Sequence, residues 1–158
     1  MPQPTGEEAA LNAVRELGLE HEVRRHGPVR SLAEAAAARG VEAADVVKTI
    51  VVRRGEGDYL FVLVPGDRTI AWPKLRALLG VSRLSMPDAG TAFEVTGYER
   101  GTITPFGART AWPVIADERL LGRRVTLGAG AHGVAVVVDA DSAVTALKAQ
   151  VADVTDPE

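Results

Sequence analysis

The sequence predicts a mixed α/β fold in which a β-sheet, or a barrel-like β core, is covered by helices. The chain has 158 residues, 46% of them hydrophobic, so it can bury one sizeable core. Runs of β-branched residues are concentrated in the middle and second half, and helix signals flank them. Strand and helix signals do not alternate regularly, which argues against a doubly wound fold. We therefore expect one domain over residues 1–158.

Five helices are predicted from residues that begin or end helices. Thr5-Gly6-Glu7-Glu8 and Ser31-Leu32-Ala33-Glu34 are capping boxes, whose side chains satisfy free backbone N–H groups. Glycines end the first two helices, and Pro73 and Gly80 bracket a third. The predicted helices cover residues 5–17, 31–40, 73–80, 87–95 and 141–150, the last one capped by Asp141.

Six strands are predicted from runs rich in β-branched residues. They cover residues 46–53, 59–64, 102–104, 112–116, 123–127 and 133–138. The segment Gly55-Glu56-Gly57-Asp58 has the composition of a hairpin turn, so the first two strands should pair with each other.

Composition excludes several classes of function. The chain has no cysteine, which removes disulfides, thiolate nucleophiles and cysteine zinc sites and fits a cytoplasmic protein. No apolar run approaches the ~20 residues of a membrane span, and the N-terminal residues do not read as a signal peptide. The net charge of −3 argues against binding DNA or other long nucleic acid through bulk electrostatics. This net charge is compatible with a local basic patch that binds one end of an RNA.

Lys48 is a candidate functional residue because the chain contains fifteen arginines but only three lysines. Side chains alternate along a strand, so Lys48 should share a face with Val46, Ile50 and Val52. Desolvation lowers the pKa of an ammonium among apolar neighbours, and such a group can hold a substrate. The alternative interpretation, which stays open here, is a lysine whose amine reaches out to water.

Two glycine-rich segments are candidate binding loops. Residues 97–107 contain three glycines and a proline, which predicts a bent loop whose backbone N–H groups can approach a ligand. Residues 128–133 match the dinucleotide pattern GxGxxG, but a β run follows them where that fingerprint needs a helix. We therefore reject the match, which counts against a nucleotide-dependent oxidoreductase, and calorimetry with NAD(P) would decide that alternative. Taken alone, residues 97–107 would be read as a set of turn residues, and residues 128–133 as a flexible loop between two strands.

The remaining polar residues suggest neither a metal site nor a covalent nucleophile. His26 and His132 do not belong to a metal-binding motif, and the serines do not form a nucleophile elbow. We expect no metal and no cofactor. A hydrolase of this sequence would have to position water or use a group of its substrate.

These segments together resemble the YbaK/ProX aminoacyl-tRNA deacylases, which are relatives of the editing domain of bacterial prolyl-tRNA synthetase. The resemblance rests on Lys48 followed by Thr49 in an apolar strand, on the pattern Gly-Tyr-x-x-Gly-x-x-x-Pro-x-Gly from Gly97, and on a glycine-rich loop before the last strand and helix. It extends from about His26 to the last predicted helix.

The resemblance implies a barrel-like α/β fold, no cofactor, and hydrolysis of the ester that joins a wrong amino acid to the 3′ end of tRNA. It implies that Lys48, Gly101 and His132 act in catalysis. The implied substrate-binding residues are His26, Thr49, Thr104, Pro105, Phe106, Gly107, Gly128 and Gly130. This sequence has Arg24 where cysteine-clearing members tend to have tyrosine, and Gly128 where they have serine, so the amino acid stays open among Ala, Cys, Ser and Thr.

Two functional hypotheses follow from this resemblance. The first is a trans-editing deacylase of mischarged tRNA, such as tRNA(Pro), with Arg24, Arg25, Arg53 and Arg54 as basic contacts and prolyl-tRNA synthetase as a candidate partner. The second is a non-catalytic module that binds tRNA or a synthetase. The two differ in whether ester cleavage occurs. The oligomeric state is not predicted.

Overall fold

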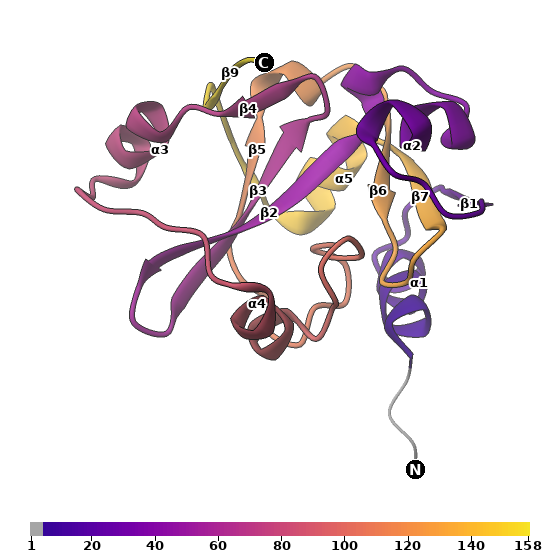
Figure 1. Cartoon of the computed structure of the whole chain (residues 1–158), viewed down its shortest axis with the longest axis horizontal. Coiled ribbons are helices and arrows are strands. Elements are labelled where there is room, and N and C mark those ends of the chain that lie inside the picture. The colour runs from indigo at the N-terminus through magenta and orange to yellow at the C-terminus, as the bar shows by residue number, and fades with distance from the viewer. Residues whose placement is uncertain (1–4) are drawn as a thin grey trace.

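The computed structural model describes residues 5–158 as helices packed around β-sheets (Figure 1). Residues 1–4, part of the segment in which we expect no signal peptide, lie outside the described residues. The helices are α1 (Gly6–Glu16), α2 (Leu32–Arg39), α3 (Trp72–Leu79), α4 (Ala89–Thr96) and α5 (Ala140–Leu147), with 3₁₀ turns η1 (Ala43–Asp45) and η2 (Glu118–Leu120). The strands are β1 (Glu22–Arg25), β2 (Val47–Gly55), β3 (Asp58–Pro65), β4 (Arg68–Ile70), β5 (Val114–Asp117), β6 (Arg124–Gly128), β7 (Val134–Asp139), β8 (Gln150–Ala152) and β9 (Thr155–Pro157).

The strands of residues 5–158 form three sheets. The largest has the order β2-β3-β5-β8, with an antiparallel β2–β3 hairpin and parallel neighbours beyond it. The second, β1-β7-β6, is antiparallel, and β4 pairs with β9 in the third. The described strands do not close into a barrel, because β2 and β6 approach each other only at a bridge between Val46 and Thr126 and then diverge (Figure 1).

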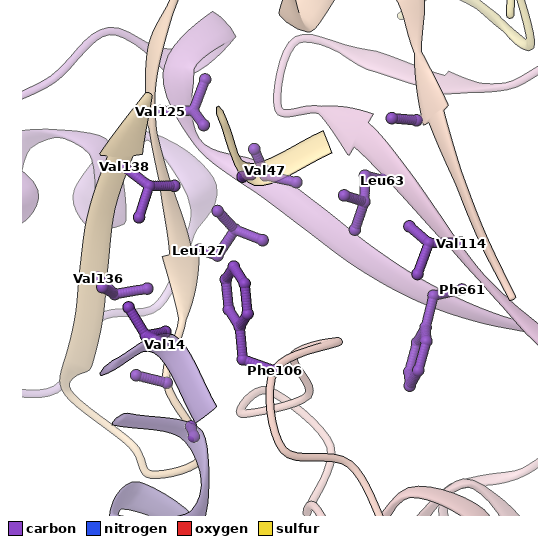
Figure 2. Close-up of a cluster of buried hydrophobic side chains, with 14 of the residues drawn as sticks. Val14, Val47, Phe61, Leu63, Phe106, Val114, Val125, Leu127, Val136 and Val138 are labelled. Atoms are coloured by element: carbon purple, nitrogen blue, oxygen red, sulfur yellow. The ribbon is translucent and has the colours of Figure 1, made fainter. Parts of the chain in front are cut away.

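Both faces of the β2–β3 hairpin are buried. Val47, Phe61 and Leu63 point toward the second sheet, where they belong to the same cluster as Leu127. Figure 2 shows the ring of Phe106 beside Leu127 in this cluster. On the opposite face, residues of both strands pack with Ile70, Leu75 and Val154; they are Val52, Leu60, Val62 and Val64. Burial on both faces explains why β3 reads as a continuous apolar run.

The capping signals predicted α1, α2 and α3 closely, and α4 overlaps the helix expected at residues 87–95. Thr5 and Ser31 cap α1 and α2 through their hydroxyl oxygens, as expected, and Gly80 ends α3 in the left-handed conformation. The fifth helix begins two residues earlier than predicted. Its N-cap is Asp139, whose carboxylate accepts bonds from the backbone N–H and the hydroxyl of Ser142, whereas Asp141 accepts a bond from the Gly122 N–H.

Residues 102–104 are not a strand, contrary to the prediction. Thr102 and Thr104 are buried, and their hydroxyls stabilise a turn rather than a strand ladder. The Thr102 hydroxyl donates to the Glu99 carbonyl oxygen, and the Thr104 hydroxyl accepts from the Phe106 N–H. Local bonds of this kind compete with strand pairing. Strands β1, β4, β8 and β9 were not predicted. None of the helices in residues 5–158 is long and apolar enough to cross a membrane.

Candidate functional site

A cleft of about 730 Å³ lies between α2, β2, the start of α4 and the loop that contains Gly101. This volume falls within the ~300–1,000 Å³ typical of small-molecule sites. The cleft is lined by Val29, Arg30, Ser31, Leu32, Ala35, Arg39, Val46, Val47, Lys48, Thr49, Ile50, Val51, Met86, Pro87, Asp88, Ala89, Ala92, Arg100, Gly101, Ile103 and Gly128.

One wall of the cleft is the outer edge of β2. This strand is the first in its sheet, so its outer backbone groups between the bridges at Val46 and Arg53 have no neighbouring strand among the described residues. Unpaired N–H and C=O groups of an edge strand can bind a partner directly. The cleft therefore offers backbone hydrogen-bonding groups as well as side chains.

Lys48 enters the cleft lining from β2. It shares the sheet face of Ile50 and Val52, as the alternation predicted, and its side chain is 27% exposed. The ammonium donates a hydrogen bond to the backbone oxygen of Arg68 in β4 and lies 3.6 Å from Oε1 of Glu158. The amine is thus neither freely exposed nor sealed in a dry core.

Thr49, the next residue, presents a buried hydroxyl oxygen that has no hydrogen-bond partner among the described residues. It also lines the cleft. A buried hydroxyl without a partner costs free energy, and such a group in a cleft is suited to bind a polar atom of a ligand.

Gly101, in the loop after α4, and Gly128, at the end of β6, border the cleft. Gly101 has φ of +89°, and a Cβ at this position would lie 3.3 Å from Cε1 of His132. The His132 side chain is 69% exposed, with Nε2 3.5 Å from Oε2 of Glu99, and it is not part of the cleft lining. The structure therefore brings His132 next to Gly101 but leaves it outside the cleft.

The segment Thr104-Pro105-Phe106-Gly107 lies behind the cleft rather than in its lining. Phe106 is 1% exposed in the core, and the Tyr98 hydroxyl donates a 2.5 Å hydrogen bond to its carbonyl oxygen. Burial raises the pKa of Tyr98 to about 12. These residues fix the shape of the loop that presents Gly101.

Two other predicted residues also lie outside the lining. Gly130 packs against helix α1, where a Cβ would approach the backbone oxygen of Gly6 to 2.2 Å. His26 has Nδ1 2.8 Å from the carbonyl oxygen of Gly27, and its buried Nε2 has no partner among the described residues. The geometry gives Gly130 a packing role.

We expect Gly130→Ala to destabilise the fold by about 2 kcal/mol or more, because it combines a left-handed backbone with a backbone clash. Gly57→Ala is the matched control, since Gly57 has φ of +65° and open space around it. Thermal unfolding monitored by circular dichroism compares the two variants. Equal melting temperatures would contradict the packing role.

Comparison with known proteins decides the family. Residues 26–145, more than half of the chain, match the family described as "Aminoacyl-tRNA editing domain". The chain belongs to this family. The described editing domain contains no group of three or more His, Asp or Glu residues placed to bind a metal ion.

Similar proteins include ligases of which the match covers a small part and proteins that this chain matches over most of their length. The proline–tRNA ligase of Thermosipho melanesiensis is 35% identical over 94 residues, which are 59% of this chain and 16% of the ligase. The Enterococcus faecalis protein named "Putative Cys-tRNA(Pro)/Cys-tRNA(Cys) deacylase EbsC" is 23% identical over 120 residues, 75% of this chain and 73% of that protein. A crystal structure of "a putative trans-editing enzyme for prolyl tRNA synthetase" superimposes with a TM-score of 0.87 at 26% identity, covering 98% of this chain and 99% of the other.

The cleft of this editing domain is basic although the chain is acidic overall. Its lining contains four cationic side chains, Arg30, Arg39, Lys48 and Arg100, and one carboxylate, Asp88. Asp88 caps α4, and the Thr91 backbone N–H holds the pKa of this carboxyl below its ordinary value. An excess of positive charge in a cleft attracts anionic ligands.

The sequence analysis did not identify Arg39 as a residue of the cleft lining. Arg39 ends an alanine-rich helix and reads as an ordinary favourable charge near a helix C-terminus. Only the fold shows that its side chain lines the cleft and donates from Nη1 to the Thr126 hydroxyl at 3.1 Å. The expected basic contacts Arg24 and Arg25 are instead bonded to Glu22 and Glu7.

Proposed function

We propose that this chain is a trans-editing deacylase that hydrolyses the ester bond of mischarged aminoacyl-tRNA in the cleft beside β2. The observation that supports this most is the meeting of Lys48 and Thr49 with the two glycine loops, at Gly101 and Gly128, around one basic cleft. The cleft volume suits an aminoacyl-nucleotide, and its positive charge suits the acceptor end of tRNA.

Each group has a role in the proposed reaction. Water adds to the ester carbonyl carbon, the bond to the ribose oxygen breaks, and that oxygen takes a proton while the amino acid leaves as a carboxylate. Backbone N–H groups around Gly101 and Gly128 stabilise the oxyanion, an effect worth ~10²–10³ in rate per donor. Lys48 and Thr49 hold the aminoacyl-adenosine in position.

The proton of the attacking water needs an acceptor. Asp88 is the one carboxylate of the cleft lining, and it is engaged in capping α4. His132 lies outside the lining. We therefore assign the proton transfer to the substrate: the neighbouring ribose hydroxyl accepts one proton of the attacking water as it passes its own proton to the leaving ribose oxygen, and the second proton of the water goes to solvent.

The substrate is proposed to be tRNA(Pro) or a related tRNA that carries a small amino acid such as Ala, Cys, Ser or Thr. Synthetase pockets distinguish side chains that differ by one methylene by only ~1–3 kcal/mol, so such errors arise and must be removed. Prolyl-tRNA synthetase is the proposed partner.

The purified chain should release label from one or more members of a panel of mischarged tRNA(Pro), and should leave Pro-tRNA(Pro) intact. Loss of labelled amino acid, measured under single-turnover conditions, checks this expectation. The competing function is a non-catalytic tRNA-binding module. Tight tRNA binding without release from any member of the panel would establish that function instead.

A further inference from the structure

The guanidinium of Arg39 lies in the cleft without an anionic partner among the described residues. Its Nη1 donates to the buried hydroxyl of Thr126 in β6, and its Nε is buried without any hydrogen-bond partner among residues 5–158. No ion pair of Arg39 with a described carboxylate exists. Burial lowers the pKa of this side chain, although arginine keeps its charge in proteins.

Both ends of the Arg39 residue are fixed by neighbours. The Thr126 hydroxyl holds the side chain, and Arg24 donates a hydrogen bond to the Arg39 backbone oxygen at the end of α2. Thr126 is fully buried at the bridge that joins the two larger sheets. The guanidinium is therefore placed by rigid elements rather than by a mobile surface loop.

A partly desolvated cation that lacks a counter-charge favours the arrival of an anion. Arginine binds phosphate with two parallel N–H···O bonds, and such charge-assisted bonds are strong. The other arginines of the lining, Arg30 and Arg100, are exposed, so water screens their charge more effectively.

We propose that Arg39 binds an oxyanion of the ligand in the cleft, namely the 5′-phosphate of the 3′-terminal nucleotide, and thereby positions the ester beside Lys48 and Gly101. This inference rests on the proposed deacylase function. Arg39 acts as a positioning residue: it holds the nucleotide and does not touch the reacting carbonyl. The carboxylate of the released amino acid is the other oxyanion that the same chemistry could recognise.

Substrates with and without the phosphate test the assignment. For a 3′-aminoacyl ester of adenosine 5′-monophosphate, Arg39→Gln should raise KM about ten- to hundredfold with little change in kcat, as expected for losing a charge-assisted hydrogen bond. For the same ester of adenosine, which lacks the phosphate, the variant should match the wild type. Arg39→Lys should restore part of the loss, and Arg15→Gln on α1 controls for net charge.

The other outcomes overturn the proposal. An equal rise in KM on both esters would show that Arg39 acts on the aminoacyl group or only supports the fold. A loss of free amino acid binding, with nucleotide binding unchanged, would assign the guanidinium to the product carboxylate.

A binding assay separates this inference from the deacylase proposal. Calorimetry with adenosine 5′-monophosphate and adenosine needs no turnover. Wild type should bind the nucleotide more tightly than the nucleoside, and Arg39→Gln should abolish the difference. If the wild type cleaves no ester but shows this difference, the deacylase function fails and the phosphate site stands. Without the difference, the phosphate site fails.

Discussion

Replacement of Lys48 by alanine is expected to lower kcat/KM for deacylation at least about a hundredfold while the fold remains intact, if this ammonium orients the aminoacyl-adenosine. The fold should survive because the side chain is partly exposed and makes one hydrogen bond, to the Arg68 backbone oxygen, and one ion pair, to Glu158. Single-turnover release of labelled amino acid from mischarged tRNA measures the effect, with circular dichroism as the check of folding.

Two variants sharpen this test. Lys74→Ala removes a lysine that pairs with Asp153 and Asp156 outside the cleft lining, and it should deacylate at the wild-type rate. Lys48→Arg keeps the charge but replaces a compact ammonium by a planar fork, so it should recover only part of the activity. Full activity of Lys48→Ala would refute the role proposed for the amine.

The second large effect is expected at Asp117, a fully buried carboxylate at the end of β5. It accepts hydrogen bonds from the Val154 N–H at 3.1 Å and the Thr155 hydroxyl at 2.9 Å, and from Arg119. Asp117→Ala leaves these donors without a partner, at about 1–3 kcal/mol for each buried donor. We expect a loss of about 3 kcal/mol or more in the free energy of unfolding, measured by urea denaturation.

Asp141→Ala provides the contrast, because Asp141 is exposed and accepts a hydrogen bond from the Gly122 N–H. It should stay within about 0.5 kcal/mol of the wild type, as most surface substitutions do. Similar urea midpoints for Asp117→Ala and Asp141→Ala would contradict the role of the buried carboxylate in joining β5 to the start of β9.

The elements that could be predicted are those determined locally. Capping side chains and C-terminal glycines lie within a few residues of the groups they satisfy, so α1, α2 and α3 are readable from the sequence. The three-residue strands β4 and β9 form only because they pair with each other, with Arg68 opposite Pro157. Residues so far apart in the chain give no local sequence pattern that predicts a strand.

The candidate site was predictable only in part for the same reason. Lys48, Thr49, Gly101 and Gly128 do meet in one cleft. Motif order could not distinguish residues that line the cleft from those that support it: Phe106 lies in the core, and Gly130 packs against the backbone of Gly6 in α1. Arg39 was missed because its partner Thr126 is 87 residues away along the chain.

The unpaired edge of β2 has a consequence for how this site should be mutated. Main-chain N–H and C=O groups on that edge persist whatever side chain replaces the native one. Alanine scanning therefore measures only what side chains contribute to ligand binding. It does not change the contribution of the backbone N–H and C=O groups. An amide-to-ester replacement in the polypeptide, introduced by semisynthesis at one position of the strand, removes a single backbone N–H donor. The change in ligand affinity then measures the contribution of that donor.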